Sequence, residues 1–212
     1  MKFIKDNKGL FLFIGLMIVF RSSIADWNPV PTGSMLPTIV EGDVIFVNKL
    51  AYDIKVPLTD YSLLNTAPVK RGDIVVFKSK RANLRLVKRI IGLPGDTIAM
   101  FNNQLYINGS PLDYKLNHSE GTKQTITELL PDKAHAIQLV GRRSRMDSFP
   151  ATIIPAEHYF AMGDNRQNSV DSRVYGFIPH SELVGRTERV LLSFNLDNHY
   201  LPRKERFLHG LD

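Results

Sequence analysis

The sequence contains no cysteine, a single tryptophan and only one long apolar run. The lack of cysteine excludes disulfides, thiolate zinc sites and a cysteine nucleophile, so a catalytic nucleophile must be an oxygen or an amine. Charged residues make up 23% and hydrophobic residues 43% of the chain, which indicates a globular domain rather than a disordered one. The net charge of +6 favours anionic neighbours such as lipid headgroups or nucleic acid. Because aromatic residues do not alternate with a basic stripe, we expect no nucleic-acid partner.

The apolar run lies at the N-terminus. Residues 1–8 carry three lysines against one aspartate, and Gly9 to Phe20 is then apolar without a break. The positive flank stays in the cytosol, so the remainder of the chain is exported. Twelve helical residues cover only about 18 Å of a hydrocarbon core of about 30 Å, and a helix extended through Trp27 would cover about 28 Å. Three interpretations follow: a membrane anchor, a secretory signal peptide cleaved after residues 23–25, or a buried core helix.

The rest of the chain has the pattern of a mostly β domain. Short β-branched stretches alternate with Gly, Pro, Asn and Asp after Trp27. We expect strands at residues 44–47, 74–77, 84–91, 97–101, 104–107, 136–140, 158–162 and 189–194. The Asn pair 102–103 and Asn108-Gly109 supply tight turns. We expect residues 113–133 to form a solvated excursion, and residues 201–209 to form a basic tail that is solvated or touches anionic lipid.

The first of three unusual segments surrounds Ser34. Pro29, Pro31 and Pro37 hold the chain extended on both sides of Gly33-Ser34, so that the loop presents one hydroxyl. A Gly-Ser pair between prolines is most often only a turn. The loop alone therefore does not establish a nucleophile.

The second segment is the predicted strand that contains Lys88. Strand alternation places Lys88 on the same face as Leu86 and Ile90. One interpretation is a lysine with a buried stem whose ammonium reaches water. The other is a desolvated amine with a lowered pKa that can accept a proton near pH 8.

The third segment, residues 163–173, is polar and directly follows a predicted strand, which indicates a structured loop. Its two aspartates and two arginines can pair within the loop and leave Ser169 and Ser172 as hydrogen-bonding hydroxyls. Asp164, Asn168 and Asp171 could instead ligate calcium, but the ligand spacing of a calcium loop is missing and the arginines oppose a cation. We expect no metal.

No histidine lies in a recognisable Ser/His/Asp context. Because the chain offers a serine, a strand lysine and a polar loop but no cysteine, a Ser/Lys dyad is the most economical catalytic arrangement.

Taken in this order, the motifs PTGSMLPT, RGDIVVF with VKRIIGLPGD, and MGDNRQNSVDSRVYGFIP resemble those of bacterial type I signal peptidases, the leader peptidase family. The resemblance runs from about Trp27 to Phe194. It implies that Ser34 is the nucleophile, Lys88 the general base and Ser169 the residue that orients the lysine. It also implies an oxyanion hole made by Thr32 and the Ser34 backbone N–H.

The same resemblance implies further roles. The residues expected to support the active-site loop are Asp164, Arg166, Asp171, Arg173 and Arg89. Shallow apolar pockets that admit small residues before the scissile bond would be lined by Val30, Met35, Leu36 and Val87. Two positions depart from the family pattern: Thr32, where serine is more common, and Gln167, where aspartate is frequent.

The resemblance implies a mostly β, antiparallel catalytic domain of signal-peptidase type, preceded by one transmembrane helix. Residues 1–8 would be cytoplasmic, 9–26 the anchor and 27–212 an extracytoplasmic domain on the periplasmic side of a bacterial inner membrane. The expected partners are preproteins and the lipid bilayer, and no cofactor is expected. Two alternatives stay open: a dedicated maturation peptidase of the same dyad class, such as one that processes a conjugative pilin, and a membrane-tethered β-domain without activity.

Overall fold

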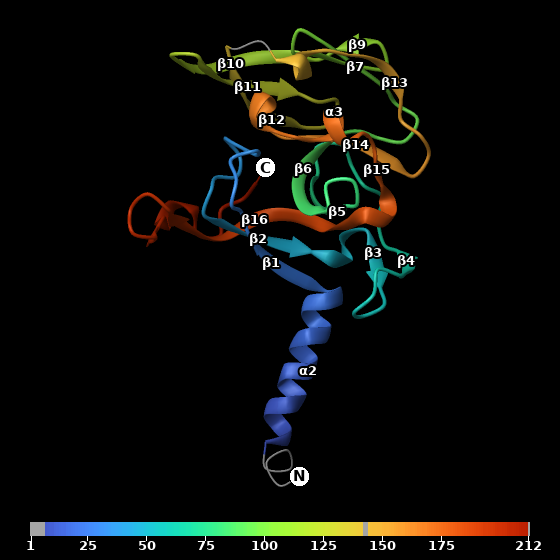
Figure 1. Ribbon diagram of the computed structural model, residues 1–212, viewed down its shortest axis with the longest axis vertical. Coiled ribbons are helices and arrows are strands. Elements are labelled where there is room, and N and C mark those ends of the chain that lie inside the picture. The colour runs from blue at the N-terminus through green and yellow to red at the C-terminus, as the bar shows by residue number, and fades with distance from the viewer. Residues whose placement is uncertain (1–6, 142–143, 212) are drawn as a thin grey trace.

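The computed structural model describes residues 7–141 and 144–211. One helix, α2 (Lys8–Ser23), projects from a domain built of short strands (Figure 1). The helix is apolar on every side, and its leucines are largely exposed, with Leu12 at 65%. Its C-terminal carbonyls are capped by a residue from the domain: the Lys49 amine donates hydrogen bonds to Arg21 O at 2.6 Å and Ser22 O at 3.2 Å. The domain thus fixes where the helix ends.

The helix is shorter than the sequence predicts. A helical extension through Trp27 is wrong, because the chain leaves the helix after Ser23 and forms strand β1 (Ala25–Pro29), which pairs with β2 (Asp43–Asn48). Across residues 7–141 and 144–211, no helix combines the length and the hydropathy that a bilayer crossing requires. Most of the segment expected to be cytoplasmic, residues 1–8, lies outside the described residues.

The domain is mostly β, as predicted, and its paired strands are antiparallel. The main sheet has the order β1-β2-β16-β5-β6-β14-β15, with β17 paired to β16. Beyond β1 and β2, its strands are β5 (Ile74–Ser79), β6 (Leu84–Gly92), β14 (His158–Met162), β15 (Ile178–Pro179), β16 (Leu183–Asn195) and β17 (Leu201–Pro202).

Three smaller sheets complete the domain. Their strands are β13 (Phe149–Ile153), β7 (Thr97–Phe101), β8 (Gln104–Ile107) and β9 (Ser110–Pro111) in one, β10 (Asp113–Glu120), β11 (Lys123–Leu129) and β12 (Ala134–Val140) in the second, and β3 (Asp53–Lys55) with β4 (Ser62–Asn65) in the third. The β3–β4 hairpin lies beside the upper end of α2, whereas β10–β12 lie at the opposite end of the domain (Figure 1). The predicted turns at 102–103 and 108–109 are confirmed by positive φ angles at all four positions.

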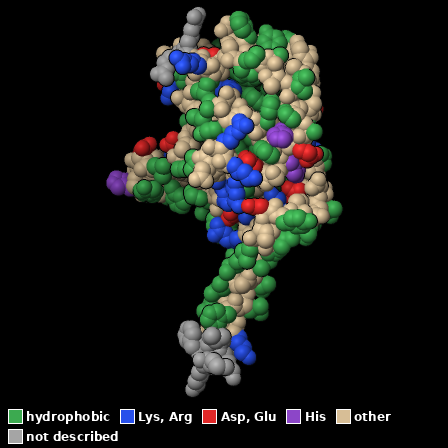
Figure 2. All heavy atoms as spheres, turned by 45° about the vertical axis from the view of Figure 1, so that its right-hand side comes forward, with side chains coloured by type: hydrophobic (Ala, Val, Ile, Leu, Met, Phe, Trp, Pro, Cys, Tyr) green, Lys and Arg blue, Asp and Glu red, His purple; other side chains and the backbone are tan. Residues whose placement is uncertain are grey.

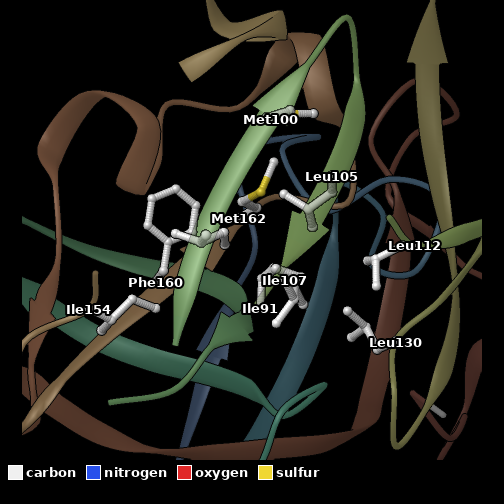
Figure 3. Close-up of a cluster of buried hydrophobic side chains, with 10 residues drawn as sticks. Ile91, Met100, Leu105, Ile107, Leu112, Leu130, Ile154, Phe160 and Met162 are labelled. Atoms are coloured by element: carbon white, nitrogen blue, oxygen red, sulfur yellow. The ribbon is translucent and has the colours of Figure 1, made fainter. Parts of the chain in front are cut away.

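The apolar side chains form separate clusters that hold the strands in place. One cluster joins the end of β6 and β14 to the β7–β8 hairpin, with Ile91, Phe160 and Met162 facing Met100 and Leu105 (Figure 3). A second cluster lies under the serine loop and includes Val30, Met35 and Ile39. Full burial of such a side chain contributes about 1.5–3 kcal/mol to the free energy of folding. Met35, the residue that follows Ser34, is therefore held firmly in the core.

Two sequence predictions are only partly correct in this part of the fold. Residues 113–133 are largely exposed, as predicted, but they form the paired β10–β11 hairpin rather than a turn-rich excursion, and Glu128 on this hairpin is fully buried. The tail at 201–209 is largely exposed, as predicted, but it is also fixed to the domain. Arg206 pairs with buried Asp43 at 2.6 Å, and Leu211, just beyond it, is only 3% exposed.

Candidate active site

Ser34 and Lys88 meet at the junction of a turn and a strand. Ser34 opens a tight turn after β1, in which Ile39 N–H donates to Met35 O at 3.0 Å. Lys88 lies on β6 opposite Val75 of β5. Its amine nitrogen is 2.6 Å from the Ser34 hydroxyl oxygen, and the lysine is only 3% exposed. A hydroxyl and an amine at this distance can exchange a proton directly.

The environment of Lys88 lowers its pKa to about 8. Burial disfavours the ammonium and is the largest cause, nearby Asp171 and Asp164 oppose the shift, and Arg173 adds to it. At pH 7 about one amine in ten is then neutral, compared with about one in three thousand at the ordinary pKa of 10.5. The structure therefore favours the desolvated lysine over one whose ammonium reaches water.

The backbone at Gly163, at the start of the polar loop, lies directly against the backbone of the serine turn. A Cβ added to Gly163 would lie 2.2 Å from Ser169 Oγ and 2.4 Å from Ser34 O, so a side chain would not fit there. The Ser169 hydroxyl donates to Asp171 Oδ2 at 2.8 Å, and the Gly163 N–H donates to the same oxygen at 2.9 Å. Ser169 is thus held on the border of the site by a carboxylate.

Asp164 and Asn165 hold the serine turn from the other side. The Asn165 side-chain amide donates to Gly33 O at 2.9 Å, and its backbone N–H donates to Ser34 O at 3.2 Å. Asp164 accepts two hydrogen bonds from Arg89, at 2.9 and 2.8 Å, and one from Thr38 at 2.5 Å. These contacts fix the backbone of Ser34 relative to β6, which carries both Arg89 and Lys88.

The arginines of the loop pair differently from the sequence-based interpretation. Arg173 does pair within the loop, with Asp171 at 2.7 Å. Arg166 instead reaches out of the loop and forms a bidentate ion pair with Glu128 of β11, at 2.7 and 2.5 Å. Asp164 pairs with Arg89 on β6. The expectation that the four charges pair internally is therefore only partly correct.

Sequence reasoning missed two buried residues in this network, Glu128 and His135. Burial acts to raise the pKa of Glu128, but the adjacent Arg166 guanidinium holds it below the ordinary value. Burial lowers the pKa of His135 to about 4, so its ring is neutral. His135 lies between the two ion pairs, with Nε2 at 3.5 Å from Glu128 Oε2 and 3.8 Å from Asp164 Oδ1. Neither residue follows a motif that would have marked it.

The remaining predicted residues surround the serine. Thr32 is exposed in the segment between β1 and Ser34. Val30 and Met35, expected to line substrate pockets, are 5% and 1% exposed and belong to the core cluster under the loop. Val87 packs against that cluster, and Leu36 is half-buried. Val30 and Met35 can form the floor of a pocket but not its open wall.

The comparison with known proteins decides the family. A sequence model of the family described as "Signal peptidase, peptidase S26" matches residues 4–192. The chain belongs to this signal peptidase family. A relative named Signal peptidase I from Pseudomonas aeruginosa is 36% identical over 207 residues, covering 90% of this chain and 73% of the relative. Signal peptidase I P from Bacillus subtilis subsp. natto is 32% identical over 192 residues, covering 89% and 88%.

A crystal structure of a signal peptidase I from Enterococcus faecalis V583 has 27% identity and a TM-score of 0.38, covering 57% of this chain and 98% of that one. That superposition is too loose to add to the argument. Membership of the family makes this chain a peptidase, which agrees with the resemblance expected from the three motifs.

Proposed function

We propose that this S26 peptidase removes signal peptides from exported preproteins by means of a Ser34/Lys88 dyad. The observation that carries the proposal is the 2.6 Å distance between the lysine amine and the serine hydroxyl, in a site where the amine is buried. An activated hydroxyl, a proton carrier and oxyanion donors are what acyl transfer requires.

In the proposed mechanism the neutral Lys88 amine accepts the Ser34 proton while Oγ attacks the scissile carbonyl carbon. The resulting ammonium then protonates the leaving amine nitrogen, and an acyl-enzyme remains on Ser34. Water deprotonated by the same amine hydrolyses this ester. The Thr32 hydroxyl and the Ser34 N–H would donate to the oxyanion in both halves of the reaction.

The substrate would bind as an extended strand between the chain leading to Ser34 and the first half of β6. β1 is the terminal strand of the sheet order, and β14 pairs with β6 only from Arg89 onwards. Arg85 of β6 donates to Asn28 of β1 at 2.7 Å, so the two segments face each other. A shallow floor made by Val30 and Met35 would favour small residues before the scissile bond.

The apolar helix supports a membrane-bound enzyme. We propose that α2, the helical part of the expected 9–26 segment, is the anchor and that the β-domain after it is extracytoplasmic, on the periplasmic side of a bacterial inner membrane. The Arg21 guanidinium lies 4.2 Å from the Trp27 ring centroid and also pairs with Asp26 at 2.5 Å. Arginine and tryptophan side chains are typical of the level at which a helix leaves the bilayer.

The full chain in neutral detergent should cleave a secretory precursor with an Ala-x-Ala site after the second alanine. The same precursor with phenylalanine in place of both alanines is the matched control and should stay intact, because the pocket floor is filled by core side chains. Gel mobility and N-terminal sequencing of the product measure the result. An enzyme that left every secretory precursor uncut but processed one pilin-type substrate would be a dedicated maturation peptidase instead.

Cleavage should rise with pH through about 8, because the base must be neutral and the pKa of Lys88 is lowered to about 8. Below that pH, kcat/KM should fall about tenfold per unit. Since the chain has no cysteine, a Lys88→Cys variant can be aminoethylated at this position alone. The product is a lysine analogue of lower pKa and should shift the acidic limb of the kcat/KM profile to lower pH. A limb that did not move would rule out Lys88 as the base.

A further inference from the structure

A pocket of about 240 Å³ lies where helix α2 meets the β-domain. We call it the basic pocket. Its lining residues are Ser22, Ser23, Lys49, Lys55, Leu58, Thr59, Asp60, Lys78, Arg85 and Val184. Four of them are cationic and one is anionic, and Figure 2 shows Lys and Arg side chains gathered on the domain directly above the helix. The catalytic dyad is not part of this lining.

Each cation of the basic pocket has a carboxylate neighbour, Lys55 pairing with Asp53 at 3.9 Å, but four cations face only three carboxylates. Lys49 caps the end of α2, and its amine is 3.8 Å from Asp26. Arg85 contacts the same carboxylate at 3.3 Å, so Asp26 is shared between them. Lys78 pairs with Asp60 at 3.0 Å, and both side chains are more than half exposed. The pocket therefore keeps a surplus of positive charge.

Burial and neighbouring cations both contribute to the lowered pKa of Lys49. Burial is the largest cause that lowers it, and Asp26 opposes the shift, but Arg85, Lys78 and Arg21 each lower the pKa further. Three neighbouring cations thus repel the Lys49 ammonium. An anion bound among them would relieve the repulsion.

The surroundings of the basic pocket are apolar. The β3–β4 hairpin beside it exposes Leu58 by 74%, Tyr61 by 70% and Leu63 by 63%. On the other side lies α2, with its exposed leucines and phenylalanines. A volume of about 240 Å³ is smaller than the roughly 300–1,000 Å³ of pockets that enclose whole drug-sized ligands. The pocket suits a molecule whose small anionic group lies inside it and whose apolar part lies outside, against the hairpin and α2.

We propose that the basic pocket binds the phosphate headgroup of an anionic phospholipid such as phosphatidylglycerol. The Lys49, Lys78 and Arg85 cations would contact the phosphate, and the hairpin leucines would contact the upper acyl chains. The inference rests on the part of the proposed function that places α2 in a membrane, and it adds a specific lipid site to it. The site would hold the domain at a fixed height above the bilayer.

Binding can be measured on the full chain in neutral detergent by calorimetric titration with dioctanoyl phosphatidylglycerol. Dioctanoyl phosphatidylcholine and glycerol phosphate are the comparison ligands. The Lys78→Gln/Arg85→Gln variant should bind the anionic lipid at least tenfold more weakly, since each cation near a headgroup contributes about fivefold. Asp60→Asn removes the one acidic lining residue and should bind about fivefold more tightly.

The matched control is Lys115→Gln/Lys123→Gln, which removes two exposed lysines from the β10–β11 hairpin at the far end of the domain. It should bind like the unmodified chain. Equal losses in both double variants would show a general charge effect and overturn the proposal. Glycerol phosphate binding as tightly as phosphatidylglycerol would also overturn it, because the ligand would then be free phosphate. The tighter binding of Asp60→Asn cannot result from misfolding.

Two further readouts separate this proposal from the proposed function. The titrations are made on the Ser34→Ala background, so they do not depend on turnover. Flotation on pure phosphatidylcholine vesicles reports the anchor by itself. Flotation without selective phosphatidylglycerol binding would refute lipid binding by the basic pocket and leave the anchor intact. Failure to float would refute the anchor, and with it the membrane as the source of the phospholipid.

Discussion

Replacing Lys88 by methionine should reduce precursor cleavage by at least about 10⁴-fold, the scale of loss when a serine hydrolase loses its base or nucleophile. Methionine has a similar length and no charge, and the site of Lys88 is 3% exposed, so the substitution removes the base without opening a cavity. The Ser34 hydroxyl, 2.6 Å away, would then have no proton acceptor. Product formation under single-turnover conditions measures the loss, and thermal unfolding checks the fold.

The double variant gives the sharper test. Because serine and lysine act as a unit, Ser34→Ala/Lys88→Met should lose no more activity than either single variant. Lys115→Met on the exposed surface of β10 is the matched lysine control and should keep full activity. Substantial cleavage by a folded Lys88→Met variant, or losses that multiply in the double variant, would disprove the dyad.

The sequence predicts the strands well where alternation is strict. β7, β8 and β14 have the predicted bounds. In β7 and β8 buried residues alternate with less buried ones, and asparagine turns end both strands, whereas β14 is a short apolar run that is buried along most of its length. The order of three polar motifs identified the family, although no single motif was specific. Local pattern was sufficient for these elements because the information lies within a few residues.

The sequence-based predictions fail where the contact that determines the local structure comes from a residue distant in sequence. Residues 113–133 are polar and were assigned to solvent, but Glu128 is buried by Arg166, 38 residues further along the chain. The extension of α2 through Trp27 is wrong because the helix stops at Ser23, and both the Lys49 cap and the pairing of β1 with β2 come from residues further along the chain. Composition cannot reveal such partners, since a lone glutamate or lysine is usually solvated.

The same distant contact leads to the second large effect. Glu128→Gln should lower the free energy of unfolding by about 3–5 kcal/mol, because it leaves the Arg166 guanidinium buried without a countercharge. Both side chains are fully buried, and the ion pair is bidentate. Glu120→Gln, an exposed change at the end of β10 in the same hairpin, should stay within about 0.5 kcal/mol. Urea denaturation followed by circular dichroism measures both values.

A compensating variant separates loss of the charge pair from loss of packing. Glu128→Leu/Arg166→Met removes both charges and should recover most of the stability, since apolar replacement of a buried pair is often neutral. Arg166 also accepts a hydrogen bond from Arg173 through its backbone oxygen, at 2.6 Å, and Asn165 beside it holds Ser34. Cleavage activity should therefore fall with Glu128→Gln and return in the double variant. If Glu128→Gln were as stable as Glu120→Gln, the buried ion pair would not stabilise the loop at residues 163–173. The inference that β11 helps to position Ser34 through this loop would then be disproved.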